Sequence, residues 1–237
     1  MNDSSIEPLF RLPFALIFDL DGVLVDSEPL HQRAKEQAFA EFGIVLEQSV
    51  YDEIKGRPDE VTLREILEAR GVAHFLAELT ERKRAFFQAI QHELQAVVGA
   101  VVFIRWAKPR FRIALATSST SRNRDLAFGV LGVGDYFESV VDASRHRIPK
   151  PNAEVFQVAI ADLRLTPEEC WIIEDSVNGI RAAKAAGCVT VGITTTFGRA
   201  KLEASGADLI VDSFEELRGI LEKALTTKDT KVHEGKP

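Results

Sequence analysis

Two aspartates at the end of an apolar run carry the clearest chemical signal in this sequence. Residues 15–25 read Ala-Leu-Ile-Phe-Asp-Leu-Asp-Gly-Val-Leu-Val, so Asp19 and Asp21 end the first part of the run and Gly22 follows them. Such a run is typical of a strand buried on both faces, and the glycine predicts a change of chain direction. On an extended chain the two carboxylates project to the same side and repel. The pair therefore predicts a divalent cation, a shared proton, or both. Taken alone, it also fits an ordinary turn.

Other polar residues follow later apolar runs, where further strands are expected to end. They are Thr117, Ser118 and Ser119 after one run and Glu174, Asp175 and Ser176 after another, with Lys150 in a loop between them. Ligands of open parallel sheets bind beyond the carboxyl ends of the strands, so these groups are predicted to meet at one sheet edge. Each group also has a simpler interpretation, as a helix cap, a turn or a solvated lysine. Their convergence, in this order along the chain, favours a common site.

The chemistry of this predicted site is that of phosphoryl transfer. Carboxylate and carbonyl oxygens suit Mg²⁺, which also binds water and substrate phosphate. The hydroxyl and backbone N–H groups at Thr117 and Ser118 can bind phosphate oxygens. Lys150 can offset the charge of Asp19 and of the phosphoryl group. The predicted site is therefore suited to positioning a phosphoryl group and stabilising its charge during transfer.

Short β-branched runs alternate with helical patterns along most of the chain, which is typical of an α/β fold with a parallel sheet. The predicted strands are Phe14–Phe18, Ile113–Ala116, Ser139–Val141, Trp171–Ile173, Val189–Ile193 and Leu209–Val211. The predicted helices between the later strands are Arg122–Leu131, Ala153–Leu163 and Asn178–Ala186. Gly187 follows the last of these and is predicted to end it.

A long helical block interrupts this alternation directly after the first strand. Residues 29–94 contain no convincing strand, but they contain apolar stripes with the spacing of a helix face. Two of these stripes are Leu30, Ala34, Ala38 and Phe42, and Leu79, Phe86, Ile90 and Leu94. The block could be a set of crossover helices, but a crossover needs far fewer residues. We therefore interpret it as a small all-helical domain inserted into the sheet domain.

The predicted domain boundaries follow from this insertion. The predicted domains are a sheet domain of residues 12–26 and 98–225 and a helical domain of residues 27–97. The two chain crossings, near residues 25–28 and 95–99, are expected to form a hinge. Residues 1–11 and 226–237 are polar and aperiodic, so we expect both tails to be disordered.

Composition and charge restrict the classes of protein to which this chain can belong. The 237 residues are 46% hydrophobic, as in globular proteins, and the net charge of −7 disfavours binding to nucleic acid or to an anionic membrane. The longest uncharged apolar stretch, residues 96–104, is too short to span a bilayer. The N-terminus has no signal-peptide pattern. We expect a cytoplasmic monomer whose partner is a small phosphorylated metabolite.

Four segments together resemble the motifs of the haloacid dehalogenase superfamily. They are Phe-Asp-Leu-Asp-Gly-Val-Leu-Val-Asp-Ser-Glu from Phe18, Ala-Thr-Ser-Ser from Ala116, Lys-Pro-Asn-Ala-Glu-Val-Phe from Lys150 and Ile-Glu-Asp-Ser-Val-Asn-Gly-Ile-Arg-Ala-Ala from Ile173. Their order matches that of the family, and the resemblance extends from about Phe14 to Leu225. It implies a Rossmann-like parallel-sheet core with an inserted helical cap domain. The insert is similar to that of β-phosphoglucomutase and phosphoglycolate phosphatase-like members.

The resemblance implies a role for each matching residue. Asp19 matches the nucleophile that receives the phosphoryl group as an aspartyl phosphate, and Asp21 matches the general acid/base. Asp19 and the backbone carbonyl of Asp21 also match metal ligands. Thr117 matches the phosphate-binding hydroxyl, and Lys150 matches the lysine that stabilises nucleophile and phosphate. The pair Glu174-Asp175 matches the acidic motif that holds Mg²⁺ directly or through water.

Within the superfamily, the second aspartate and the acidic motif favour phosphoryl transfer over other reactions. Dehalogenases need neither of them. Phosphonate-cleaving members have another residue at the position of Asp21 and use a Schiff-base lysine in the cap. Lys35, Lys55 and Lys83 lie in the predicted cap, but Asp21 disfavours that route.

Residues of the predicted cap distinguish a phosphatase from a phosphomutase. His31 stands where β-phosphoglucomutases have a hinge histidine, although it also fits an exposed helix position. In the segment Lys55-Gly56-Arg57-Pro58-Asp59, mutases place an arginine where this chain has Asp59. We therefore predict an Mg²⁺-dependent phosphatase for a small phosphomonoester such as a sugar phosphate, with His31, Lys55, Arg57 and Asp59 as specificity candidates. The alternatives are a β-phosphoglucomutase-like phosphomutase and a non-catalytic sensor of phosphorylated ligands.

Overall fold

The computed structural model describes residues 11–233, and the chain divides into two compact units. One unit, which we call the helical unit, is Val25–Gln95, where the sequence predicted an inserted domain at residues 27–97. The other, the sheet unit, contains the chain before and after it. Residues 1–10 and 234–237 belong to the tails that were predicted to be disordered, and they lie outside the described residues.

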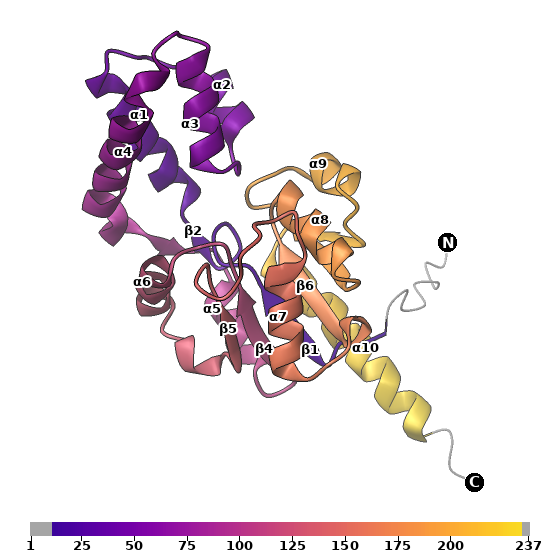
Figure 1. Ribbon diagram of the computed structural model, residues 1–237. Coiled ribbons are helices and arrows are strands. Elements are labelled where there is room, and N and C mark those ends of the chain that lie inside the picture. The colour runs from indigo at the N-terminus through magenta and orange to yellow at the C-terminus, as the bar shows by residue number, and fades with distance from the viewer. Residues whose placement is uncertain (1–10, 234–237) are drawn as a thin grey trace. The chain divides into compact units, whose positions relative to one another are not determined.

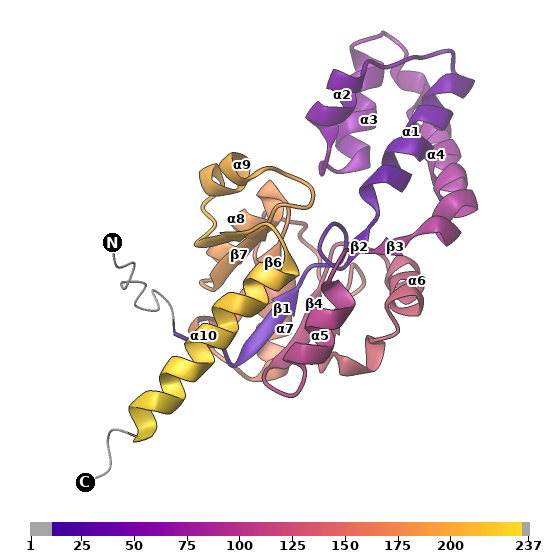
Figure 2. The same cartoon turned by 180° about the vertical axis from the view of Figure 1, so that it is seen from behind.

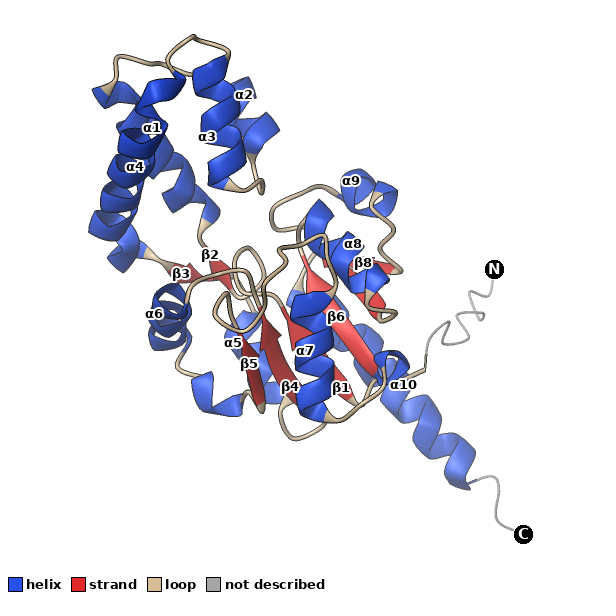
Figure 3. Ribbon diagram, in the orientation of Figure 1, coloured by secondary structure: helices blue, strands red, loops and turns tan. Residues whose placement is uncertain are grey.

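A six-stranded sheet forms the centre of the sheet unit (Figure 1 and Figure 3). Its strands are β1 (Ala15–Phe18), β4 (Arg112–Ala116), β5 (Ser139–Val141), β6 (Cys170–Glu174), β7 (Val189–Ile193) and β8 (Leu209–Val211). They lie in the order β5-β4-β1-β6-β7-β8, and every neighbouring pair is parallel. The predicted α/β fold with a parallel sheet is confirmed, and each predicted strand is present with its ends shifted by at most one residue.

Helices cover both faces of this sheet. Figure 1 shows α7 and α8 over one face, and Figure 2 shows α5 and α10 over the other. The helices of the sheet unit are α5 (Ala100–Ala107), α6 (Ser121–Leu131), α7 (Glu154–Leu163), α8 (Val177–Ala185), α9 (Arg199–Ala204) and α10 (Phe214–His233). The sequence predicted α6, α7 and α8 to within one residue, and it did not predict the others. Among the helices of residues 11–233, none has the length and apolar character needed to cross a membrane.

Helix α10 extends into the tail where the sequence predicted disorder. It runs to His233, whereas the sequence placed the end of the ordered chain at residue 225. Leu217 and Leu221 are one turn apart and fully buried, so they anchor the first turns of the helix. The Thr226 hydroxyl donates to the Glu222 carbonyl at 2.8 Å within the continuing helix. The anchored turns provide the nucleus from which the polar part of the helix extends.

The core on the two faces of the sheet follows from the alternation of side chains along each strand. Ala15 and Ile17 of β1 belong to the apolar cluster that includes residues of α7 and α8. Phe18 is fully buried, and its ring lies 6.1 Å from that of Phe103 on α5 and 6.5 Å from that of Phe214 on α10. Each face of the sheet therefore has its own apolar layer, and β1 contributes to both.

The strand order brings the carboxyl ends of three strands together. Phe18, at the end of β1, pairs with Leu115 of β4 on one side and with Ile173 of β6 on the other. The residue that follows β1, Asp19, donates its N–H to the Ile173 carbonyl at 3.1 Å. Glu174 continues β6 at the same level. This central position of β1 is a topological switch point, where open parallel sheets bind their ligands.

The helical unit has an apolar core of its own. Its α-helices are α1 (Glu28–Glu41), α2 (Gln48–Ile54), α3 (Asp59–Glu68) and α4 (Leu76–Ile90), with 3₁₀ turns at Ala73–Phe75 and Gln91–Glu93. Phe39, Leu63, Leu67 and Leu79 are fully buried in that core. Two short strands, β2 (Val25–Asp26) and β3 (Gln95–Ala96), pair with each other at the two chain crossings.

We predict that Phe18→Ala destabilises the sheet unit by about 3–5 kcal/mol, because it removes a buried ring and leaves a cavity among other aromatic rings. Urea unfolding checks this, followed by the fluorescence of Trp106 and Trp171, which both lie in the sheet unit. The control is Val98→Ala, because Val98 is 92% exposed. Equal midpoints for the two variants would contradict the packing described here.

Candidate active site

A buried lysine lies between two carboxylates at the carboxyl end of the sheet. The Lys150 Nζ atom is 2.6 Å from Asp19 Oδ1 and 2.6 Å from Glu174 Oε1, and none of the three side chains is more than 10% exposed. The ammonium group also lies 4.6 Å from the centre of the Phe156 ring on α7. Burial by itself lowers the pKa of Lys150, but the two carboxylates raise it above its usual value, so the lysine stays charged.

Asp175 adds a third buried carboxylate to this pair. The residue is 4% exposed, and burial, with the nearby charges of Glu174 and Asp19, raises its pKa well above the usual value. Burial also raises the pKa of Asp19 to about 7, although Lys150 opposes the shift. When all three acids are ionised, one lysine faces three negative charges. The cluster therefore needs additional protons or a cation.

Glu174 uses both of its carboxylate oxygens within the protein. Oε1 accepts from Lys150, and Oε2 accepts from the N–H groups of Asp175 and Ser176 at 3.0 and 3.1 Å and from the Ser176 hydroxyl at 3.0 Å. Gly179 of α8 packs so closely that a Cβ atom there would lie 1.9 Å from this carboxyl group. These contacts make Glu174 a positioning group for Lys150 and for the start of α8. Its predicted role in metal binding then fits a ligand that acts through water.

The turn after β1 brings the backbone of Gly22 against the Asp175 side chain. Gly22 has a φ of +76°, and a Cβ atom there would lie 1.9 Å from Asp175 Oδ2 and 2.7 Å from the Thr196 hydroxyl. The Thr195 hydroxyl donates to the Gly22 carbonyl. Because this position combines a left-handed backbone with a close approach, the turn requires glycine.

The loop after β4 connects Thr117, a predicted phosphate-binding residue, to Asp21. Thr117 is 1% exposed, and its N–H donates to the Val141 carbonyl at 2.9 Å. Its hydroxyl accepts from the Ser119 N–H at 3.1 Å, and the Ser119 hydroxyl donates to the Asp21 carboxylate. Ser118 is exposed. Ser119 thus joins Thr117 to Asp21, and Asp21 in turn interacts electrostatically with Asp19.

The donor set of this network fits a hard divalent cation. Within the described chain, no three histidine, cysteine or acidic side chains meet as a ready set of metal ligands. The Asp175 carboxylate does lie against the turn at Asp21-Gly22 and interacts electrostatically with Asp19. A cation here would take those two carboxylates and the Asp21 carbonyl, with water or phosphate completing its shell. Mg²⁺ prefers such a mixed oxygen shell.

The specificity candidates of the helical unit lie at and around a second buried charge cluster. Asp59, the first residue of α3, is 2.5 Å from Lys83 Nζ and 3.3 Å from Lys35 Nζ. His31 Nδ1 is 2.8 Å from Lys83 Nζ, and its ring stacks on Phe87 with centres 4.3 Å apart. Burial by itself raises the pKa of Asp59, but the two lysines lower it. Burial lowers the pKa of Lys83.

The other two candidates lie outside these ion pairs. Arg57 pairs with Glu65 at 2.8 Å, and Lys55 follows α2. Lys35 and Lys83 are the buried cations of this unit, although the sequence suggested them only as Schiff-base alternatives. Each of them lies one helical turn before a buried phenylalanine, and this spacing is the signal that could have identified them.

The segment after β7 contributes residues that the sequence analysis missed. Thr196 donates a hydrogen bond to Asp175, and Thr195 holds the Gly22 carbonyl, as described above. Both follow Ile193, the last residue of β7. A run of hydroxyl residues after a predicted strand is the same signal that identified Thr117 and the two serines after it, so it could have identified these two residues as well.

Known proteins resemble this chain over most of its length. A family model described as haloacid dehalogenase-like hydrolase matches residues 15–187. The chain is 30% identical over 218 residues to a phosphorylated carbohydrates phosphatase of Thermotoga maritima, which covers 89% of this chain and 99% of that relative. It is also 30% identical over 210 residues to the β-phosphoglucomutase of Bacillus subtilis, covering 86% of this chain and 91% of the relative. A haloacid dehalogenase family hydrolase from Deinococcus radiodurans, solved with bound phosphate and sodium, matches with a TM-score of 0.74 and 27% identity, covering 90% and 96% of the two chains.

We predict that Mg²⁺ raises the melting temperature more at about pH 8 than at about pH 5. The pKa of Asp19 is about 7 in the folded protein and 3.8 without the fold. Without a cation, the folded state therefore loses stability as the pH rises from the lower of these two values to the higher one. Above that range the carboxylates are ionised, so Mg²⁺ binding stabilises the fold most there. Differential scanning calorimetry checks this, with Na⁺ at equal ionic strength as the control. An equal Mg²⁺ shift at both pH values would refute this description of the cluster.

We also predict that Asp59→Asn loosens the helical unit, because it leaves two buried lysines without their shared carboxylate, at a cost of about 3 kcal/mol. Hydrogen exchange measured by mass spectrometry should show faster exchange in peptides of residues 25–95 and no change in those of the sheet. Asp52→Asn is the matched control, since Asp52 is exposed on α2. The same exchange rates in both variants would show that the ion pairs contribute nothing.

Proposed function

Because this chain belongs to the haloacid dehalogenase-like hydrolase family, we propose that it hydrolyses small phosphomonoesters, phosphorylated sugars in particular, with Mg²⁺ and through an aspartyl phosphate. The chain is a phosphoric monoester hydrolase, in keeping with its family and its phosphatase relative. The observation that carries the proposed mechanism is the position of Lys150 between Asp19 and Glu174. Lys150 holds the Asp19 carboxylate in place at the switch point of the sheet, and it provides a positive charge for an entering phosphate.

In the first proposed step, the Asp19 carboxylate attacks phosphorus and the bond from phosphorus to the sugar oxygen breaks. Asp21 gives its proton to that oxygen, so the sugar leaves as an alcohol. In the second step, Asp21 takes a proton from a water molecule, whose oxygen attacks the phosphorus of the aspartyl phosphate. Inorganic phosphate leaves and Asp19 is restored. The covalent intermediate divides one difficult displacement into two easier ones.

The remaining residues of the network position the phosphoryl group. The Thr117 hydroxyl and the N–H groups of its loop are suited to bind the phosphate oxygens. Lys150 offsets negative charge, and Glu174 keeps Lys150 in place. Asp19, Asp175 and the Asp21 carbonyl are the proposed Mg²⁺ ligands. When bound, Mg²⁺ supplies positive charge beside the transferred group.

A phosphomutase is the second candidate, because the chain is as similar to the β-phosphoglucomutase of Bacillus subtilis as to the phosphatase of Thermotoga maritima. Both reactions proceed through the aspartyl phosphate and differ in whether water or a sugar hydroxyl accepts the phosphoryl group. Asp59 supports the phosphatase, since a carboxylate engaged by Lys35 and Lys83 stands where the mutases are expected to have an arginine. His31, Lys55, Arg57 and Asp59 stay predictions as specificity residues.

We predict that Asp19→Asn lowers kcat at least about 10³-fold on every substrate, because the amide cannot form the acyl phosphate. A panel of sugar phosphates, assayed for free phosphate with Mg²⁺ and again with EDTA, measures this. Asp135→Asn is the matched control, because Asp135 is exposed in a 3₁₀ turn. Equal turnover in the two variants would exclude the proposed nucleophile. Isomerised sugar phosphate without free phosphate would identify a mutase.

A further inference from the structure

Ser119 connects three parts of the site. Its N–H donates to Thr117 Oγ1 at 3.1 Å, and its carbonyl accepts from the Ala143 N–H at 3.0 Å. Its hydroxyl donates to Asp21 Oδ2. One residue therefore joins the phosphate-binding hydroxyl, the acid/base and the loop after β5.

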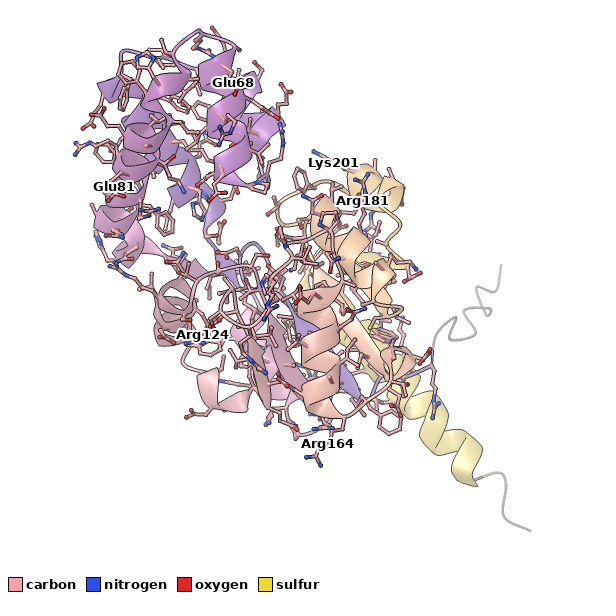
Figure 4. All side chains as sticks on the ribbon, in the orientation of Figure 1. Glu68, Glu81, Arg124, Arg164, Arg181 and Lys201 are labelled. Atoms are coloured by element: carbon pink, nitrogen blue, oxygen red, sulfur yellow. The ribbon has the colours of Figure 1, made fainter. Side chains whose placement is uncertain are left out.

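The loop after β5 is itself held in place. The Asp142 side chain is 1% exposed, and it accepts from Arg124 Nη1 at 2.5 Å. It also accepts from the Ser144 N–H at 2.9 Å and from the Ser144 hydroxyl at 2.6 Å. Arg124 projects from α6, the helix that the Ser119 loop enters (Figure 4). Ala143 therefore presents its N–H from a fixed position, and Ser119 cannot shift without breaking this contact.

We propose that Ser119 is a positioning residue for Asp21, an inference that rests on the proposed function. Asp21 lies just before a tight turn, and its side chain is partly exposed, so its carboxyl group needs a partner to hold one orientation. The Ser119 hydroxyl is one such partner. Because the same residue binds Thr117, the distance from the phosphoryl group to the proton donor is set by a single loop. General acid catalysis requires this proton to lie within hydrogen-bond reach of the leaving oxygen.

The leaving group of the substrate separates this role from a general structural one. A sugar alkoxide is a poor leaving group and needs the proton of Asp21 as its bond to phosphorus breaks. p-Nitrophenolate is stable without that proton. The ratio kcat/KM reports the steps up to the aspartyl phosphate, so loss of the positioning residue should affect it for the sugar phosphate and spare it for p-nitrophenyl phosphate.

The test measures kcat/KM of Ser119→Ala for both substrates in Mg²⁺. We expect a fall of about 10–100-fold for the sugar phosphate and less than about threefold for p-nitrophenyl phosphate. Ser119→Thr, which keeps the hydroxyl, should recover most of the loss. Ser205→Ala is the matched control: it removes a hydroxyl that donates to the Lys201 carbonyl on α9, and it should change neither value.

The ratio of the two kcat/KM values does not depend on the fraction of folded protein, so partial unfolding of the variant cannot imitate the expected result. An equal loss on both substrates, or no loss on either, would overturn the positioning role while the wild-type activity stands. A wild-type protein that turns over neither substrate would instead refute the proposed function.

Discussion

The ammonium group of Lys150, held between the carboxylates of Asp19 and Glu174, is the interaction on which the rest of the site depends. Each of these charges would be unstable if buried alone, because it loses its hydration. They compensate one another only while β1, β6 and the loop before α7 keep their register. The same arrangement leaves Asp175 without a full counter-charge, and for this reason a cation fits here. In the helical unit, Asp59 pairs with two buried lysines, and Glu28 interacts electrostatically with the same lysines.

The fold meets this electrostatic requirement by placing β1 between β4 and β6. The carboxyl ends of three strands that are far apart in the sequence therefore meet at one edge of the sheet. Two glycines then allow the close approach that the carboxylates need. Gly22 lets the chain turn against Asp175, and Gly179 lets α8 begin beside Glu174. Neither glycine takes part in the chemistry. Both are required because any side chain there would displace a carboxylate.

The sequence predicted the strands well, because buried parallel strands form apolar runs, and the polar residues at their ends are conspicuous. Asp19, Thr117 and Glu174 all follow or end such runs. What it could not show depends on contacts between distant segments. Lys35 and Lys83 look like surface lysines until α1 and α4 bury them beside Asp59, and the hydrogen bond from Ser119 to Asp21 exists only because β4 lies next to β1. Helix α10, which continues where the sequence predicted disorder, is anchored by packing and not by its polar end.

Chemical trapping of the covalent intermediate tests the central claim most directly. Borohydride reduces an acyl phosphate on an aspartate to the alcohol, which changes the mass of the peptide that carries it. The account predicts that protein quenched in acid during turnover of a sugar phosphate, and then reduced, shows this mass change at Asp19 and not in protein without substrate. An unmodified Asp19, or modification of another residue while the substrate is consumed, would contradict it.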